Sequence, residues 1–129
     1  MMPGDIMRSD VYRAVHRLVG LAGRRSLPRP YLAADFASHP HLTSAVYIVT
    51  DNKSRVRYVG SASRKDGCVS DRIREHLRDA SRDRIWAYVW FLPFGPEVDI
   101  GHVRLMERLV GERLRPTDNR RLPGFRRVS

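Results

Sequence analysis

The sequence predicts a small domain of the α+β class, and three observations support this prediction. Two short apolar runs, 45-AVYIV-49 and 57-RYVG-60, each contain a tyrosine and are separated by a polar, turn-forming segment. A third run, 84-RIWAYVWFLP-93, is rich in the aromatic and β-branched residues that favour strands. Apolar residues at helical spacing occur before, between and after these runs. The predicted order is therefore helix, strand, strand, helix, strand, helix.

The composition limits the class of partner. The chain has 129 residues, 42% of them apolar, which is enough for one compact domain. Lys and Arg total 24 against 14 Asp and Glu, and the net charge of +10 favours polyanions, nucleic acid first. All the basic residues except Lys53 and Lys65 are arginines, which bind phosphate in a bidentate way but are also frequent in proteins of GC-rich genomes. The arginine excess alone therefore discriminates little.

Cysteine content and hydropathy indicate the compartment. Cys68 is the only cysteine, which excludes an intrachain disulfide and a cysteine-built zinc finger. The longest apolar run, 86-WAYVWFL-92, is far shorter than the ~20 residues that span a bilayer, and the N-terminus lacks the apolar region of a signal peptide. We therefore expect a cytoplasmic protein with no membrane partner.

The N-terminal part is expected to form a helix followed by an ordered connector. Residues 9–25 place apolar side chains at spacings of three and four, and the arginines of this helix are expected to be solvated. The connector, 26–42, carries three prolines and space for one short helix. Its two histidines, His39 and His41, are expected at the surface.

Two further helices are predicted after the tyrosine strands. In 70–83, Ile73 and Leu77 belong to an apolar stripe that packs inward. In 97–116, a longer apolar face continues until Pro116. The arginine-rich tail that follows is typical of a mobile basic end.

Pairing of the first two strands brings the tyrosines together. If the turn is centred on Asn52 and Lys53, or the loop 51-DNKS-54 keeps the same register, Tyr47 faces Tyr58 across a hairpin. Because side chains alternate by two, the same face is expected to carry Ala45, Val49, Val56 and Gly60. From the hairpin alone, stacking that stabilises the fold explains the tyrosine pair more simply than a chemical role.

Downstream residues extend the tyrosine pair into a longer motif. Arg72 and His76 stand four apart, so they share one helical face. Five elements then occur in order: 45-AVY-47, 58-YVG-60 followed by Ser61, Arg72-x-x-x-His76, Glu107, and 116-PTDN-119. Together, over residues 44–121, they resemble the motifs of the GIY-YIG nucleases. Ala45 stands where that family usually has glycine, and Val46 and Val59 replace isoleucines.

The resemblance implies a β-β-α-β-α core, in which a small three-stranded antiparallel sheet is flanked by helices. It divides the chain into an N-terminal helical extension and connector (1–43), a nuclease core (44–121) and a basic C-terminal tail (122–129). It also implies an endonuclease that hydrolyses DNA phosphodiester bonds with a divalent metal, Mg²⁺ or Mn²⁺.

The resemblance further implies a role for each residue of the site. Tyr47 and Tyr58 would line it, and we expect Tyr47 to assist deprotonation of the attacking water. Arg72 would bind the scissile phosphate, and His76 would support proton transfer or position a tyrosine. We expect all the site residues to converge on one concave, basic face.

The last two implied site residues are a metal ligand, Glu107, and a hydrogen-bonding residue, Asn119. Mg²⁺ prefers oxygen ligands and keeps several waters, so one carboxylate plus phosphate oxygens is a sufficient anchor. The ordinary alternatives are an ion pair between Glu107 and a neighbouring arginine, and a turn at Asn119. Glu75 and Glu112 are competing metal ligands.

Two other functions agree with the same residues. One is a non-catalytic nucleic-acid-binding module of the same fold, and the other is an RNA-directed nuclease. For a DNA nuclease, branched or damaged DNA is an open alternative to ordinary duplex, and the chain is expected to act as a monomer or a homodimer.

Overall fold

The computed structural model describes residues 5–20, 25–63, 67–79 and 84–118. In these residues, four strands form one antiparallel sheet in the order β1-β4-β2-β3, with helices on both faces. The strands are β1 (Tyr31–Leu32), β2 (Ser44–Thr50), β3 (Val56–Ser63) and β4 (Tyr88–Pro93). The helices are α1 (Ser9–Leu18), the short 3-10 helix η1 (Phe36–Ser38), α2 (Val69–His76) and α4 (Ile100–Leu114).

The α+β class is confirmed, but the expectation of three strands is wrong. Tyr31 pairs with Val89 and Leu32 with Tyr88, which adds β1 to the outer side of β4. A strand of two residues has no hydrophobic periodicity, and Pro30 immediately precedes it. The short length of β1 therefore explains why the sequence pattern does not reveal it.

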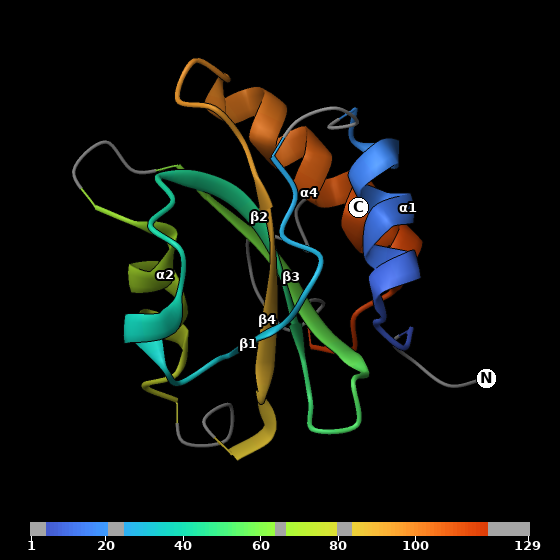
Figure 1. Cartoon of the computed structure of the whole chain (residues 1–129), viewed down its shortest axis with the longest axis vertical. Coiled ribbons are helices and arrows are strands. Elements are labelled where there is room, and N and C mark those ends of the chain that lie inside the picture. The colour runs from blue at the N-terminus through green and yellow to red at the C-terminus, as the bar shows by residue number, and fades with distance from the viewer. Residues whose placement is uncertain (1–4, 21–24, 64–66, 80–83, 119–129) are drawn as a thin grey trace.

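Two hydrophobic cores lie on opposite faces of the sheet. Figure 1 shows α2 on one face and α1 with α4 on the other. The core under α2 contains Tyr47, Tyr58 and Ile73, whereas the core under α1 and α4 contains Tyr12, Trp90 and the apolar face of α4. Consecutive β4 residues divide between the cores, as the alternation of side chains along a strand requires.

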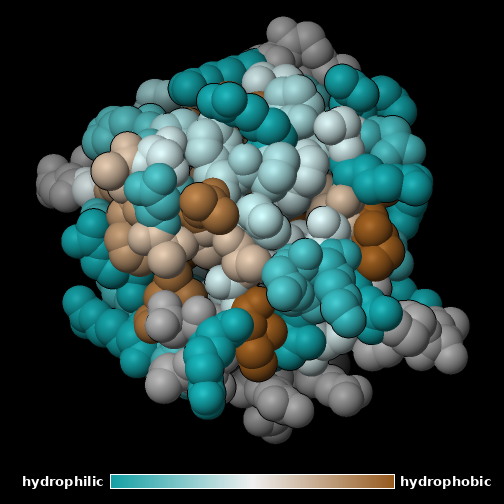
Figure 2. Space-filling model, turned by 60° about the horizontal axis from the view of Figure 1, so that its bottom comes forward, coloured by the Kyte–Doolittle hydropathy of each residue, from teal (hydrophilic) through white to brown (hydrophobic). Residues whose placement is uncertain are grey.

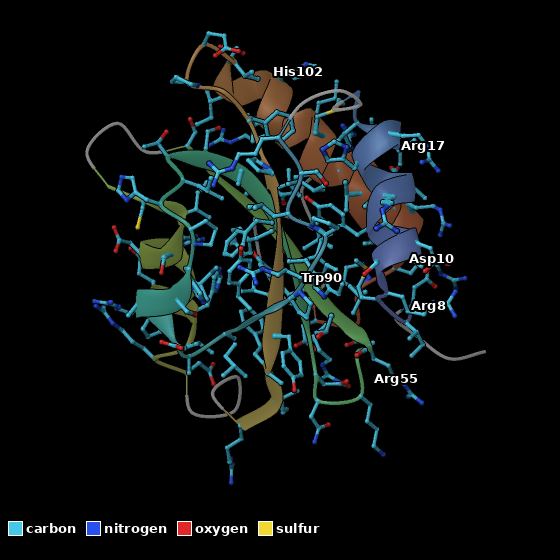
Figure 3. The ribbon with its side chains drawn as sticks, viewed as in Figure 1. Arg8, Asp10, Arg17, Arg55, Trp90 and His102 are labelled. Carbon is cyan, nitrogen blue, oxygen red and sulfur yellow. The ribbon has the colours of Figure 1, made fainter. Side chains whose placement is uncertain are left out.

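The N-terminal segment packs into the same structure as the rest of the chain. The Tyr12 hydroxyl donates a 2.5 Å hydrogen bond to the carbonyl of Phe91, and the Tyr12 ring stacks on Trp90 with 5.7 Å between centroids. Figure 3 shows Trp90 inside the molecule and Arg17 on the outer side of α1. The Asp5 amide donates to the Leu114 carbonyl, so α1 and the chain before it are attached to both the sheet and α4.

The predicted register of the hairpin is wrong. Tyr47 pairs with Gly60, and Tyr58 pairs with Val49. The loop between the two strands spans residues 51–55, and Ser54 within it has a left-handed φ of 66°. The Asp51 carboxylate accepts hydrogen bonds from the amides of Lys53 and Arg55, which stabilises this loop.

A second irregularity follows the loop. Thr50 pairs with Val56 while Val49 pairs with Tyr58, so Arg57 is an extra residue in β3 and forms a bulge. The bulge turns Val56 toward the α4 face, contrary to the expected alternation, while Ala45 and Val49 remain with the tyrosines.

The helices are shorter than their sequence patterns. The Asp71 carboxylate accepts a hydrogen bond from the Cys68 amide, and α2 begins directly afterwards, at Val69. At α4, the Asp99 carboxylate caps the helix by accepting from the Gly101 amide, so residues 97–98 lie outside it. The helix ends before Arg115, whose φ of 53° is left-handed.

One histidine of the connector is buried, contrary to expectation. His39 contacts the Ser70 hydroxyl through Nδ1 at 3.0 Å and the Leu32 carbonyl through Nε2 at 2.9 Å. It therefore links β1 to the start of α2, whereas His41 is exposed as predicted.

The surface is predominantly polar at the end of the molecule that carries the β2–β3 loop. Figure 2 shows hydrophilic side chains over most of this face, with small hydrophobic patches between them. Within the described ranges, no helix is long and apolar enough to cross a membrane.

Candidate active site

Tyr47 lies at the centre of the α2 side of the sheet. It is on β2, between β3 and β4, and its side chain is fully buried. Its hydroxyl makes no hydrogen bond of good geometry with the described residues, although a weak hydrogen bond with the Tyr58 side chain is the smallest cause of its raised pKa. A buried phenol without a partner is costly, so this hydroxyl requires an explanation beyond packing.

Gly60 makes room for that hydroxyl. A Cβ placed on Gly60 would lie 2.6 Å from the Tyr47 hydroxyl oxygen and 2.7 Å from a ring carbon of Tyr58. The Tyr47 ring therefore crosses over the glycine on β3, the edge strand of the sheet. Close approach of a side chain, rather than an unusual backbone conformation, explains this glycine.

Tyr58 and His76 form an aromatic cluster beside Tyr47. Their ring centroids are 4.9 Å apart, and the Tyr47 and Tyr58 centroids are 6.0 Å apart. His76 comes from the last turn of α2 and is buried, because α2 lies directly over the tyrosines. The tyrosines are therefore diagonal neighbours on one face, and not the directly opposed pair that the hairpin predicts.

Trp86 is a member of this cluster that sequence reasoning missed. Its ring stacks on Tyr58 at 5.1 Å and lies 5.4 Å from His76. Its indole N–H donates to Asp118, which also forms a 3.0 Å ion pair with Arg57. The available signal was the aromatic run before β4, which we interpreted only as a strand.

Asn119, the last residue of the predicted site, lies outside the described residues.

Arg72 brings a positive charge to the same region. It lies on α2 one turn before His76 and forms a 3.1 Å ion pair with Glu75. Its side chain is part-exposed, and it lines a polar cavity of about 320 Å³ at the end of β3. The competing carboxylate Glu75 is thus engaged with Arg72.

Glu107 approaches from the other face of the sheet, so the expectation that all the site residues converge on one face is wrong for this residue. It lies on α4 and accepts a 2.5 Å hydrogen bond from the hydroxyl of Ser61, on β3. Ser61 lines the cavity with Arg72, and the remaining lining includes Arg104 of α4. The cavity therefore connects α2 with α4 at the end of the edge strand, although the two helices cover opposite faces.

The charges at this edge act on one another. Burial raises the pKa of Glu107, while the Ser61 hydrogen bond and the charges of Arg104 and Arg72 oppose that rise. Burial also raises the pKa of Tyr47 well above its ordinary value, with further contributions from Tyr58 and Glu107 and an opposing one from Arg72. Tyr47 therefore keeps its proton at neutral pH.

Comparison with known proteins adds no assignment. No protein-family model, curated protein or solved structure matches this chain. The likeness to GIY-YIG nucleases consequently rests on the motif residues of the sequence alone.

The residues at the cavity fit an oxygen-liganded divalent cation. The hydroxyls of Ser61 and Ser63 line the cavity, and the carboxylate of Glu107 adjoins it through its hydrogen bond with Ser61. These oxygens are the hard donors that Mg²⁺ prefers. In the part of the chain that the structure describes, no group of three or more His, Cys, Asp or Glu could hold a metal. Glu107 would therefore be a single carboxylate anchor, and phosphate oxygens and water would complete the coordination.

The contact at Gly60 leads to a stability prediction. Gly60→Ala is expected to lower the free energy of unfolding by about 1–3 kcal/mol, because the methyl group collides with two buried rings. Urea denaturation measures this change. Gly101→Ala is the control: its methyl group meets only the end of the Asp99 side chain, and alanine is favoured over glycine in a helix, so this variant should not be destabilised. Equal stability of the two variants would contradict the described position of Tyr47.

Proposed function

We propose that this protein is a divalent-metal-dependent endonuclease that hydrolyses DNA phosphodiester bonds. The observation that carries the proposal is the convergence of two charges on one buried hydroxyl. Arg72 from α2 and Glu107 from α4 both shift the pKa of Tyr47, whose hydroxyl has no hydrogen-bond partner among the described residues. A buried polar group left in this state under the influence of opposite charges is typical of a catalytic site.

Arg72 is suited to bind the scissile phosphate. Its guanidinium presents several N–H donors to phosphate oxygens and carries a charge that stabilises the additional negative charge of the transition state. Because Arg72 is part-exposed at the cavity, a phosphodiester can reach it without unfolding α2.

Tyr47 contributes a neutral phenol. Since its pKa is raised, it donates or accepts a hydrogen bond toward the attacking water or the phosphate, and it does not remove the proton as a phenolate. This differs from the role that we expected for Tyr47 from the sequence. His76, which packs on Tyr58, supplies an imidazole, a common general base of hydrolases.

Glu107 would hold the metal ion beside the cavity, where it contacts the lining residue Ser61. A bound Mg²⁺ supplies Lewis-acid stabilisation of charge on the phosphate and leaving oxygens. The Ser61 hydroxyl fixes one carboxylate oxygen of Glu107, which orients the other toward a ligand.

The test is cleavage of a panel of nucleic acids by the purified protein. Supercoiled, linear, branched and single-stranded DNA, and RNA, are incubated with Mg²⁺ or with EDTA. We expect cleavage of DNA that requires Mg²⁺, and a loss of about 10²-fold in rate for Arg72→Ala, because a charged donor to the transition state is removed. Arg74→Ala is the matched control: Arg74 lies on the same helix, exposed, with its guanidinium over Phe36.

Other outcomes of this panel identify the alternatives. Tight DNA binding without cleavage would favour a non-catalytic binding module of the same fold. Cleavage of RNA alone would favour an RNA-directed nuclease. An equal loss of rate in Arg72→Ala and Arg74→Ala would remove the specific role of Arg72.

A further inference from the structure

The cavity at the end of β3 contains a second arginine that belongs to none of the sequence motifs. Arg104 of α4 and Ser63 of β3 line the cavity together with Arg72 and Ser61. The two arginines come from helices on opposite faces of the sheet, so they meet only around the edge strand. A cavity of about 320 Å³ is larger than one phosphate group and leaves room for the adjoining sugar.

Arg104 forms no ion pair with the residues that the structure describes, although its charge acts on Glu107, one turn away on α4. Among the described residues, Arg8, Arg57, Arg72 and Arg113 each pair with a carboxylate. Arg104 has no ion-pair partner in the same part of the chain, and its side chain is exposed. A planar guanidinium in a polar cavity, beside a second guanidinium, is suited to an anion with several acceptor oxygens.

Hydrogen-bond donors at the cavity also select an anion. The Ser61 hydroxyl already donates to Glu107, so its proton is not available to a ligand. The remaining side-chain donors of the lining are those of Arg72, Arg104 and Ser63.

We propose that Arg72 and Arg104 form a two-arginine clamp on the DNA backbone, in which Arg104 binds the phosphate next to the one that Arg72 binds. This inference rests on the proposed function for the identity of the anion. It places the substrate strand across the end of β3, between α2 and α4. Recognition there is of backbone phosphate and therefore independent of base sequence.

The experiment measures DNA binding without cleavage. Dissociation constants of fluorescein-labelled duplex and single-stranded oligonucleotides are determined in EDTA over a series of NaCl concentrations. Loss of one phosphate contact lowers the slope of log K against log salt by about 0.9 for duplex and about 0.7 for single strands. We expect Arg104→Ala to show this change and to bind several-fold more weakly, equally for unrelated sequences. Arg104→Lys should restore the slope, because the charge is retained.

Arg108→Ala is the matched control. Arg108 lies one turn further along α4, is exposed like Arg104, and is not part of the cavity lining. It should bind DNA like the wild type, and circular dichroism melting should show that both variants fold. An unchanged constant and slope in Arg104→Ala, or an equal change in Arg108→Ala, would overturn the clamp.

The clamp and the proposed function fail separately. A wild-type protein that binds DNA but does not cut it, with the slope change intact in Arg104→Ala, removes the enzyme and keeps the clamp. A wild-type protein that cuts DNA, with no slope change in Arg104→Ala, removes the clamp and keeps the enzyme. A wild-type protein that binds no nucleic acid overturns both.

Discussion

Glu107→Gln is expected to lower the rate of DNA cleavage by about 10³-fold at saturating Mg²⁺, because it removes the carboxylate charge that anchors the metal. Glutamine has nearly the same shape, and its amide oxygen can still accept the hydrogen bond from Ser61. The loss would therefore report the missing charge and not a change in packing. The measurement is the single-turnover rate as a function of Mg²⁺ concentration.

Glu107→Gln should be at least as stable as the wild type. Burial raises the pKa of Glu107 in the folded state above its unfolded value, so the ionised carboxylate destabilises the fold once the pH exceeds the folded-state pKa. Below the ordinary pKa of glutamate, both states are protonated and this cost disappears. Glu107→Gln should thus unfold at a higher temperature than the wild type at neutral pH, and the difference should diminish as the pH falls.

Glu112→Gln provides the control for both measurements. Glu112 is on the same helix but exposed, and it is the alternative to Glu107 as the metal ligand predicted from the sequence. It should retain cleavage, and its stability should match the wild type. Full activity in Glu107→Gln would contradict a metal-binding role, and equal losses in the two variants would assign the effect to the charge of α4 in general.

Strong periodicities made most of the fold predictable. β2 and β4 are buried along almost their whole length, and the apolar stripes of α2 and α4 pack on the sheet as their spacing requires. Burial of an apolar face dominates the energy of such elements, so their type is encoded locally. Their ends depend on single caps, such as Asp71 and Asp99, that periodicity does not reveal.

The hairpin register depends on local backbone irregularities and not on hydrophobic periodicity. A left-handed Ser54 and an extra residue at Arg57 together displace the pairing, so that Tyr47 meets Gly60 and not Tyr58. Neither position carries glycine or the Asn-Gly pair that usually marks such geometry. Because the total displacement at the tyrosines is even, they remain on one face, and the predicted neighbourhood of the site survives the wrong register.

The site was only partly accessible to sequence reasoning. Arg72 and His76 share a helix, so their spacing alone places them together. Glu107 and Arg104 come from the opposite face. Arg104 lines the cavity, and Glu107 contacts the lining residue Ser61, only because β3 is the edge of the sheet. Trp86 joins the aromatic cluster because its ring stacks on Tyr58, which is distant from it in the sequence. Such contacts depend on topology, which a single sequence does not show.

Tyr47→Phe is expected to lower the cleavage rate by about 10³-fold without lowering stability. The change removes only a buried hydroxyl that has no well-formed hydrogen bond among the described residues, so the folded state loses at most a weak contact with Tyr58. A positioned proton donor or acceptor contributes about 10²–10⁴-fold to catalysis. Single-turnover cleavage and urea denaturation of the same preparation measure the two quantities.

Tyr12→Phe removes a hydroxyl in the same way, but its expected effects on stability and cleavage are the reverse. The Tyr12 hydroxyl donates to the Phe91 carbonyl and accepts from the Leu27 amide, on the far side of the sheet from Tyr47. Its removal should cost about 1–3 kcal/mol of unfolding free energy, because buried partners are left unpaired, and it should leave cleavage intact. If Tyr47→Phe instead lost stability and kept its activity, Tyr47 would be an ordinary core aromatic, and the unpaired hydroxyl would carry no information about catalysis.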